Sequence, residues 1–156
     1  MLQMVLCRID DRLIHGQLTT QWLPQYPADA LFIVDDAVAA DAFLSEMICM
    51  LAPAGLQVLV MDVPSAAQKM AELPPAARVI LLVKTPLTLC ALQKQGVDIP
   101  AVSVGGMGMR PGRSMLYKNI AASCEERSAL QQLSESGCPV YCQILPSDKP
   151  VDIRSL

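Results

Sequence analysis

The sequence has only one histidine among its 156 residues, and aromatic residues make up 4% of it. Its formal net charge is −3, so there is no excess of basic residues to attract a nucleic acid. The few aromatic residues do not interleave with basic ones, as they would on a platform for single strands. These shortages argue against a nucleic acid as partner.

Paired cysteine motifs are also missing. None of the six cysteines forms a Cys-x-x-Cys motif, and the closest pair, Cys138 and Cys142, has no histidine or second pair nearby to complete a zinc site. Cys7, Cys49, Cys90 and Cys142 lie in apolar segments, where a reduced thiol behaves as a small core residue. We therefore expect reduced, structural cysteines.

No apolar run is long enough to cross a membrane. The longest candidate, Met47–Met61, is interrupted by Pro53 and Gly55 and falls short of the roughly 18–20 apolar residues that a crossing needs. The first residues lack the charged-then-apolar pattern of a secretory leader. We expect a cytoplasmic protein with no membrane insertion of this chain, and its length fits one domain spanning residues 1–156.

Short runs rich in apolar, β-favouring residues alternate with longer helical patterns. Strands are predicted at Leu2–Cys7, Ala30–Asp35, Gln57–Asp62, Arg78–Lys84, Ala101–Val104, Leu116–Ala121 and Val140–Leu145. Helices are predicted at Gly16–Leu23, Ala39–Leu51, Ser65–Leu73, Pro86–Gln95 and Glu125–Ser136. This alternation predicts an α/β fold, with a single open, doubly wound, mostly parallel sheet of about seven strands and helices on both faces.

Ligands of such folds bind outside the carboxyl ends of the strands, where the strand order reverses. If the first strand is central, the fourth and fifth predicted strands are its neighbours. Those two strands are followed by Lys84-Thr85-Pro86 and by Gly105–Gly108, and the first strand is followed by the histidine loop. We expect these three loops to meet in one crevice.

The histidine loop, Arg8–Thr19, surrounds His15 with two arginines and two aspartates. Histidine is suited to accept and pass on a group near neutral pH. The free backbone amides of Gly16, Gln17 and Leu18 would begin the helix that follows. A surface histidine without a catalytic role is the alternative, but the charges and the strand-to-helix position favour a reactive group.

The glycine-rich segment Gly105–Gly112 lacks the third small residue of a dinucleotide fingerprint and the Gly-Lys-Ser/Thr of a P-loop. It is either a wide turn that needs positive φ angles or a backbone wall close to a transferred group.

Asp35 and Asp36 end the second strand, either as a metal pair or as a solvated helix entry. No further acidic or histidine partner lies close by, so we expect no metal there. Trp22 is predicted to be a core residue.

Three segments together carry a resemblance to a known family. Arg8–Gln17, which reads RIDDRLIHGQ, closely resembles the N-terminal motif of the IIB components of the mannose/fructose/sorbose class of the bacterial sugar phosphotransferase system. Val34–Asp41 resembles that family's second-strand exit, and Val102–Met107 resembles its glycine loop. The resemblance covers nearly the whole chain and implies a seven-stranded, mostly parallel sheet.

The resemblance implies a phosphocarrier. His15 would accept a phosphoryl group from the phosphohistidine of a IIA protein and pass it to a sugar held by a membrane transporter made of IIC and IID proteins. The chain would lie in the cytoplasm, at the inner face of the cell membrane through these partners, and would use no cofactor.

The residues around His15 suit this chemistry. Phosphoryl transfer between imidazoles needs a neutral nitrogen, in-line placement and positive charge near the phosphoryl oxygens. Arg12 and Arg8 are expected to supply that charge, together with the amides at the helix start. Asp10 or Asp11 would orient Arg12 or the imidazole. The donor is already a high-energy phosphoramidate, so no metal is expected.

His15 must reach two partners, so we expect it at the rim of the crevice. The crevice and partner face would consist of Asp35, Asp36, Lys84, Thr85, Gly105, Gly106 and Met107. Met107 and Met109 would offer adaptable apolar contacts, unless both are buried under the loop. Two other functions remain open: a small-molecule hydrolase that uses His15 with Asp10 or Asp11, and a non-catalytic binding domain.

Overall fold

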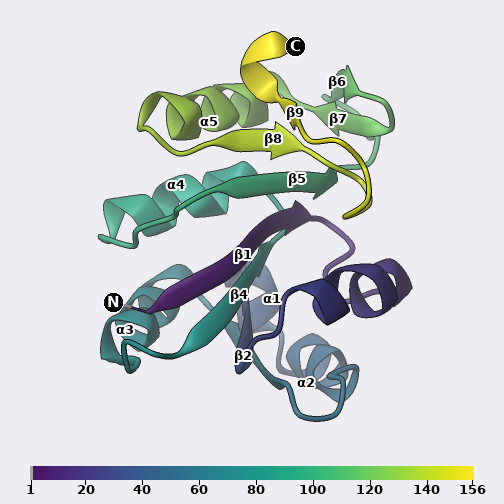
Figure 1. Cartoon of the computed structure of the whole chain (residues 1–156). Coiled ribbons are helices and arrows are strands. Elements are labelled where there is room, and N and C mark those ends of the chain that lie inside the picture. Colours follow the sequence, from purple (N-terminus) through teal and green to yellow (C-terminus); the bar gives the residue numbers. More distant parts are fainter. Residues whose placement is uncertain (1) are drawn as a thin grey trace.

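The structure is a computed structural model that describes residues 2–156, and its centre is a seven-stranded sheet (Figure 1). The strand order is β3-β2-β4-β1-β5-β8-β9, parallel except for β9, which pairs with β8 in the antiparallel sense. The strands are β1 (Gln3–Asp10), β2 (Ala30–Val34), β3 (Gln57–Met61), β4 (Arg78–Val83), β5 (Val102–Gly106), β8 (Val140–Cys142) and β9 (Val151–Asp152). The prediction of an open, mostly parallel sheet is confirmed.

Helical segments cover both faces of this sheet. The α-helices are α1 (Asp36–Ala40), α2 (Ala42–Met50), α3 (Val63–Glu72), α4 (Pro86–Lys94) and α5 (Cys124–Glu135). Three short segments are a π-helical η1 (Leu18–Trp22) and the 3-10 helices η2 (Leu23–Gln25) and η3 (Ile153–Ser155). In Figure 1, α3, α4 and α5 lie on one side of the sheet and α2 lies on the other.

The sheet carries an apolar core on each face because β2 is apolar throughout and β4 is apolar from Val79 to Val83. In β4, Val79, Leu81 and Val83 pack with α3, α4 and α5, whereas Ile80 and Leu82 pack with η1, α1 and α2. Successive side chains of a strand point to opposite faces, so a continuous apolar run is what a strand buried on both sides requires. This is the reason that the strand predictions from such runs hold.

The first strand is longer than predicted. The sequence prediction ended it at Cys7 and placed Arg8–Asp10 in the loop, but β1 continues to Asp10 and both charged residues are fully buried. A buried charge is tolerated when it is paired and hydrogen-bonded, and Arg8 and Asp10 are both. The polarity of Arg8 and Asp10 is therefore not a sign that the strand has ended.

The prediction of one strand at Leu116–Ala121 is wrong. That segment is a separate antiparallel hairpin, β6 (Ser114–Tyr117) and β7 (Ile120–Ala122), with a turn at Lys118 and Asn119. Lys118 has a φ of 48°, the left-handed conformation that tight hairpins require. The seventh strand of the main sheet is instead β9, which was not predicted.

Two predicted helices are also divided. Gly16–Leu23 becomes the successive short segments η1 and η2, with Pro24 in η2. Ala39–Leu51 is interrupted at Asp41, whose extended backbone ends α1 and whose side chain accepts a hydrogen bond from the Leu44 amide to begin α2. An aspartate favours such a cap over a helix interior.

The strand order places β1 between β4 and β5, as the sequence analysis anticipated. The loops that follow these three parallel strands therefore emerge at the same edge of the sheet, and the histidine loop is the central one. No helix within residues 2–156 combines the length and the apolar character needed to cross a membrane.

Candidate active site

His15 lies in the loop between β1 and η1, and its side chain is 16% exposed. Its Nδ1 lies 2.7 Å from the carbonyl oxygen of Leu13. Its Nε2 lies 3.6 Å from Oδ2 of Asp10 and is shielded from solvent without a hydrogen-bond partner. The imidazole is thus near the surface, but in this conformation Nδ1 is hydrogen-bonded and Nε2 is covered.

Asp10 connects His15 to Arg12. Arg12 donates from Nε to Oδ1 at 3.0 Å and from Nη2 to Oδ2 at 2.9 Å, a two-pronged pairing, and its backbone amide also donates to Oδ1. These hydrogen bonds with Asp10 raise the pKa of Arg12 above its ordinary value. The Arg12 side chain remains 47% exposed, so a firmly charged guanidinium faces solvent beside His15.

Arg8 does not face the site surface, which corrects the expectation that it contacts a phosphoryl group. Its side chain is fully buried and stacks 4.0 Å above the ring of Trp22. It donates to Oγ of Ser103 and to the carbonyl oxygens of Gln143 and Ile144. Burial lowers the pKa of Arg8 to about 10, although Asp10 partly offsets this effect. Arg8 remains charged at neutral pH and acts here as a buried tie between β1, β5 and the segment after β8.

The glycines that end β5 make room for this buried pair. A Cβ on Gly105 would overlap the guanidinium of Arg8, and a Cβ on Gly106 would overlap the carboxylate of Asp10. Neither glycine has a positive φ; only Gly112 in this segment does. The interpretation as a wide turn with positive φ angles therefore changes, because the turn is confined to Pro111 and Gly112. Gly105 and Gly106 accommodate side chains of β1 and also line the cavity beside Arg12.

The two methionines of the glycine loop differ in exposure. Met107, predicted for the partner face, is fully buried, and its carbonyl oxygen accepts a hydrogen bond from the Ala121 amide. Met109 is 57% exposed. The expectation for Met107 is wrong because this side chain anchors the loop in the core, whereas Met109 is available at the surface.

The other predicted face residues have local structural partners. Asp35 caps α1 through the Val38 amide, and Asp36 accepts a hydrogen bond from the Val63 amide at the start of α3. Thr85 caps α4, and Lys84 precedes it at the end of β4. None of these four residues, which follow β2 and β4, lines the cavity beside Arg12. Residues 2–156 contain no cluster of three or more histidine, cysteine or acidic side chains arranged for a metal ion.

A small polar cavity of about 210 Å³ opens beside Arg12. Its lining residues are Asp11, Arg12, Gln17, Gly105, Gly106, Met107, Gly108, Asn119 and Ile144. Asn119 was missed from the sequence because it belongs to the unforeseen hairpin turn. Arg113, also missed, holds the loop above this cavity and has only 2% of its side chain exposed.

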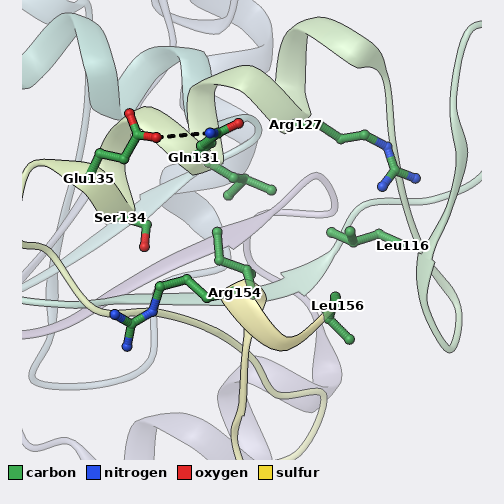
Figure 2. A pocket seen from close by; sticks show the side chains of 9 residues that line it. Leu116, Arg127, Gln131, Ser134, Glu135, Arg154 and Leu156 are labelled. Atoms are coloured by element: carbon green, nitrogen blue, oxygen red, sulfur yellow. Dashed lines mark hydrogen bonds between the residues drawn. The ribbon is translucent and has the colours of Figure 1, made fainter.

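A larger cavity of about 550 Å³ lies elsewhere, between α5, β6 and the C-terminal segment (Figure 2). Its two arginines are already engaged: Arg127 donates to Ser114 and Met115, and Arg154 pairs with Asp152. Figure 2 shows their guanidinium groups pointing away from one another. This cavity therefore presents no converging polar groups, and the candidate active site is the one at His15.

Residues 4–156 match the profile of the family described as PTS system sorbose subfamily IIB component. The fructose-specific EIIB component of the PTS from Bacillus subtilis (strain 168) is 31% identical over 153 residues, which cover 97% of this chain and 94% of the relative. The mannose-specific EIIAB component from Escherichia coli (strain K12) is 31% identical over 152 residues, 97% of this chain but 47% of that protein.

The crystal structure of the IIBSor domain of the sorbose permease from Klebsiella pneumoniae superposes with a TM-score of 0.92 and 31% identity, over 99% of this chain and 95% of that one. The chain belongs to the sorbose-subfamily IIB components of the sugar phosphotransferase system. The resemblance seen in the sequence is thereby confirmed.

Proposed function

We propose that the chain acts as a single phosphocarrier domain over residues 1–156. His15 accepts a phosphoryl group from the phosphohistidine of a IIA protein and transfers it to a sugar during uptake through a IIC/IID membrane transporter. Family membership and the surroundings of His15 support this proposal. In this function the domain works in the cytoplasm and meets the membrane only through its partners.

One observation carries the proposal: His15 and Arg12 share the Oδ2 atom of Asp10. Asp10 is fully buried and its two oxygens are bound by Arg12, so it holds the guanidinium beside the imidazole, whose Nε2 lies 3.6 Å from Oδ2. Nη1 of Arg12 has no hydrogen-bond partner within residues 2–156 and is free to bind a phosphoryl oxygen. A guanidinium is well matched to phosphoryl oxygens in both charge and geometry.

The transfer occurs in two steps. In the first, the P–N bond of the donor phosphohistidine breaks and a P–N bond to His15 forms. In the second, that bond breaks and an O–P bond to a sugar hydroxyl forms, with the hydroxyl proton released. Because Nδ1 is hydrogen-bonded and Nε2 is covered, the imidazole must turn outward before the first step. Arg12 and the amides of Gly16, Gln17 and Leu18 at the helix start then stabilise the phosphoryl charge.

The hydrolase alternative gains no support from this arrangement. Nδ1 of His15 is hydrogen-bonded to the backbone carbonyl of Leu13. Within residues 2–156, no serine, threonine or cysteine side chain is hydrogen-bonded to the ring as a nucleophile would be. Asp10 is occupied by Arg12 at both oxygens, so it is a poor general base.

The test is phosphorylation by a reconstituted system. The protein is incubated with labelled phosphoenolpyruvate, the general phosphotransferase proteins and a IIA protein. We expect one acid-labile, alkali-stable phosphoryl group per chain, and none in His15→Gln with an unchanged melting temperature. Label that persists in a folded His15→Gln variant would overturn the proposal, and turnover of small esters without label would support the hydrolase.

A further inference from the structure

Arg113 is a buried cation that joins elements from distant parts of the chain. Its Nε and Nη2 donate to the two carboxylate oxygens of Glu126, at 2.8 and 2.7 Å. Its Nη1 donates to Oδ2 of Asp11 at 3.2 Å and to the carbonyl oxygen of Gly108 at 2.8 Å. One guanidinium thus holds the start of α5, the β1 exit and the glycine loop together.

Glu126 and Asp11 are themselves fixed. Glu126 forms a reciprocal capping box with Ser123 at the start of α5 and lies 3.5 Å from the hydroxyl of Thr85 at the β4 exit. Oδ2 of Asp11 accepts a second hydrogen bond, from the Gly108 amide at 3.0 Å. Gly108 is therefore bound through both its amide and its carbonyl, by Asp11 and Arg113 respectively.

The segment held in this way begins at the cavity beside Arg12, which Gly108 lines. We call residues 108–112 the lip. Met107 anchors its first end in the core, and Arg113 anchors its second end. Between these anchors every lip residue is exposed, including Met109 and Arg110. The lip is thus a surface segment fixed at both ends, and its first residue, Gly108, lines the same cavity as Arg12.

Arg113 itself cannot be a phosphoryl ligand, because its side chain is 2% exposed and each of its three guanidinium nitrogens already donates to a protein oxygen. Hydrogen bonding to Glu126 and Asp11 raises its pKa above the ordinary value despite burial. Its effect on the site must therefore pass through Asp11 and the lip.

We propose that Arg113 is a positioning residue that, through Asp11 and Gly108, holds the lip as a docking surface for the phosphohistidine-bearing donor protein. The proposal rests on the phosphocarrier function above and adds a division of labour. Asp10 serves the chemistry by orienting Arg12 and His15, whereas Asp11 serves recognition by fixing the lip. A pre-organised lip lowers the entropic cost of docking and strengthens binding of the donor without altering the chemical step.

The test compares three aspartate variants. Asp11→Ala removes the acceptor of the Gly108 amide but leaves Arg113 paired with Glu126, so the fold should survive. Asp11→Asn removes the charge and keeps a side-chain oxygen for that amide. Asp29→Ala breaks an exposed aspartate–arginine pair with Arg78, at the opposite edge of the sheet. Arg113→Lys tests the cation directly, with its melting temperature checked.

Single-turnover phosphorylation is measured against donor concentration. For Asp11→Ala we expect the half-saturating donor concentration to rise roughly tenfold, as for one or two lost hydrogen bonds. The saturating rate should stay within about twofold of that of the unchanged protein. Asp11→Asn should largely restore affinity, Asp29→Ala should match the unchanged protein, and a folded Arg113→Lys should resemble Asp11→Ala. In parallel, hydrogen exchange at the Gly108 amide should accelerate in Asp11→Ala but not in Asp11→Asn or Asp29→Ala.

An unchanged half-saturating concentration in Asp11→Ala, or a lower saturating rate with unchanged affinity, would overturn the docking role. If the unchanged protein takes no label from any donor, the proposed function fails and the docking role fails with it. Exchange at Gly108 is measured without any donor, so it still shows whether Asp11 fixes the lip.

Discussion

The carbonyl oxygen of Leu13 lies 2.7 Å from Nδ1 of His15, and Leu13 has a φ of 57°. Residues other than glycine rarely adopt this left-handed conformation, which costs about 1 kcal/mol or more. Leu13 is also buried, so packing holds it in place. The strained turn therefore aims a hydrogen-bond acceptor at one particular ring nitrogen.

This contact predicts the tautomer of His15. A carbonyl oxygen only accepts hydrogen bonds, so the neutral imidazole should carry its proton on Nδ1 and leave Nε2 as the lone pair. Nitrogen-15 NMR of the unphosphorylated protein, at a pH where the ring is neutral, should show this single tautomer. A mixture like that of free histidine would mean that the Leu13 contact does not persist in solution.

Arg12 should not be replaceable by lysine. Arg12→Lys keeps the positive charge but loses the planar fork that binds both oxygens of Asp10. We expect the saturating rate of phosphoryl transfer to fall roughly tenfold or more. Arg78→Lys is the matched control, since Arg78 pairs with Asp29 away from the site. Equal rates for both variants would remove Arg12 from the transfer step.

Gly105 should not tolerate a methyl group. Gly105→Ala would place a Cβ where the Arg8 guanidinium lies, and Arg8 cannot move without losing its buried acceptors. Urea unfolding should show a loss of about 1–3 kcal/mol or more. Gly108→Ala is the control, because its Cβ would meet only Oδ2 of Asp11 at 3.9 Å. Similar losses in both variants would contradict this explanation.

The ion pair at Glu126 predicts how stability depends on pH. Burial alone would raise the pKa of Glu126, but hydrogen bonds from Arg113 and Ser123 outweigh it and hold the pKa below the ordinary 4.5. The unfolded chain therefore binds the proton more readily. The stabilisation is complete above about pH 4.5 and is lost as the pH falls through the lower folded pKa.

Urea unfolding between pH 2 and 7 should show this loss for the unchanged protein. Glu126→Gln should be destabilised by roughly 2–3 kcal/mol at pH 7, because Arg113 loses its buried counter-charge. Its stability should then decline less steeply below pH 4.5. Parallel pH curves for the two proteins would exclude Glu126 as a source of the dependence.

The thiols should fall into two reactive classes. Cys49 and Cys124 are exposed, although the sequence placed Cys49 in an apolar segment. Burial raises the pKa of Cys138 and Cys142 to about 11, which suppresses the reactive thiolate. The buried cysteines are Cys7, Cys90, Cys138 and Cys142. A colorimetric disulfide reagent should titrate two thiols quickly in the native protein and the rest only after denaturation; more than two fast thiols would contradict the burial.

The sequence predicts well where burial is uniform. The apolar runs of β2 and β4 identify their strands, and Ser123 with its acidic followers identifies the start of α5. The neighbours of β1 also follow once the first strand is taken as central, and parallel strands place the loops after them at one edge of the sheet. The sequence therefore predicts the edge of the sheet at which His15 lies.

Charged residues in buried places are what the sequence does not disclose. Arg8 and Arg113 have the composition of a loop, yet each is buried because a partner distant in sequence binds it. Such partners come from the fold and not from local spacing. The same holds for Gly105, whose role depends on a side chain from another strand.

The ties of Arg8 to Gln143 and Ile144 span 135 and 136 residues. During synthesis from the N-terminus, β1 leaves the ribosome long before its acceptors exist. Until the segment after β8 arrives, the Arg8 guanidinium lacks two of its carbonyl partners and resists burial. The loop that bears His15 therefore becomes properly shaped only near the end of translation, and an unfinished chain would carry the histidine without a working site around it.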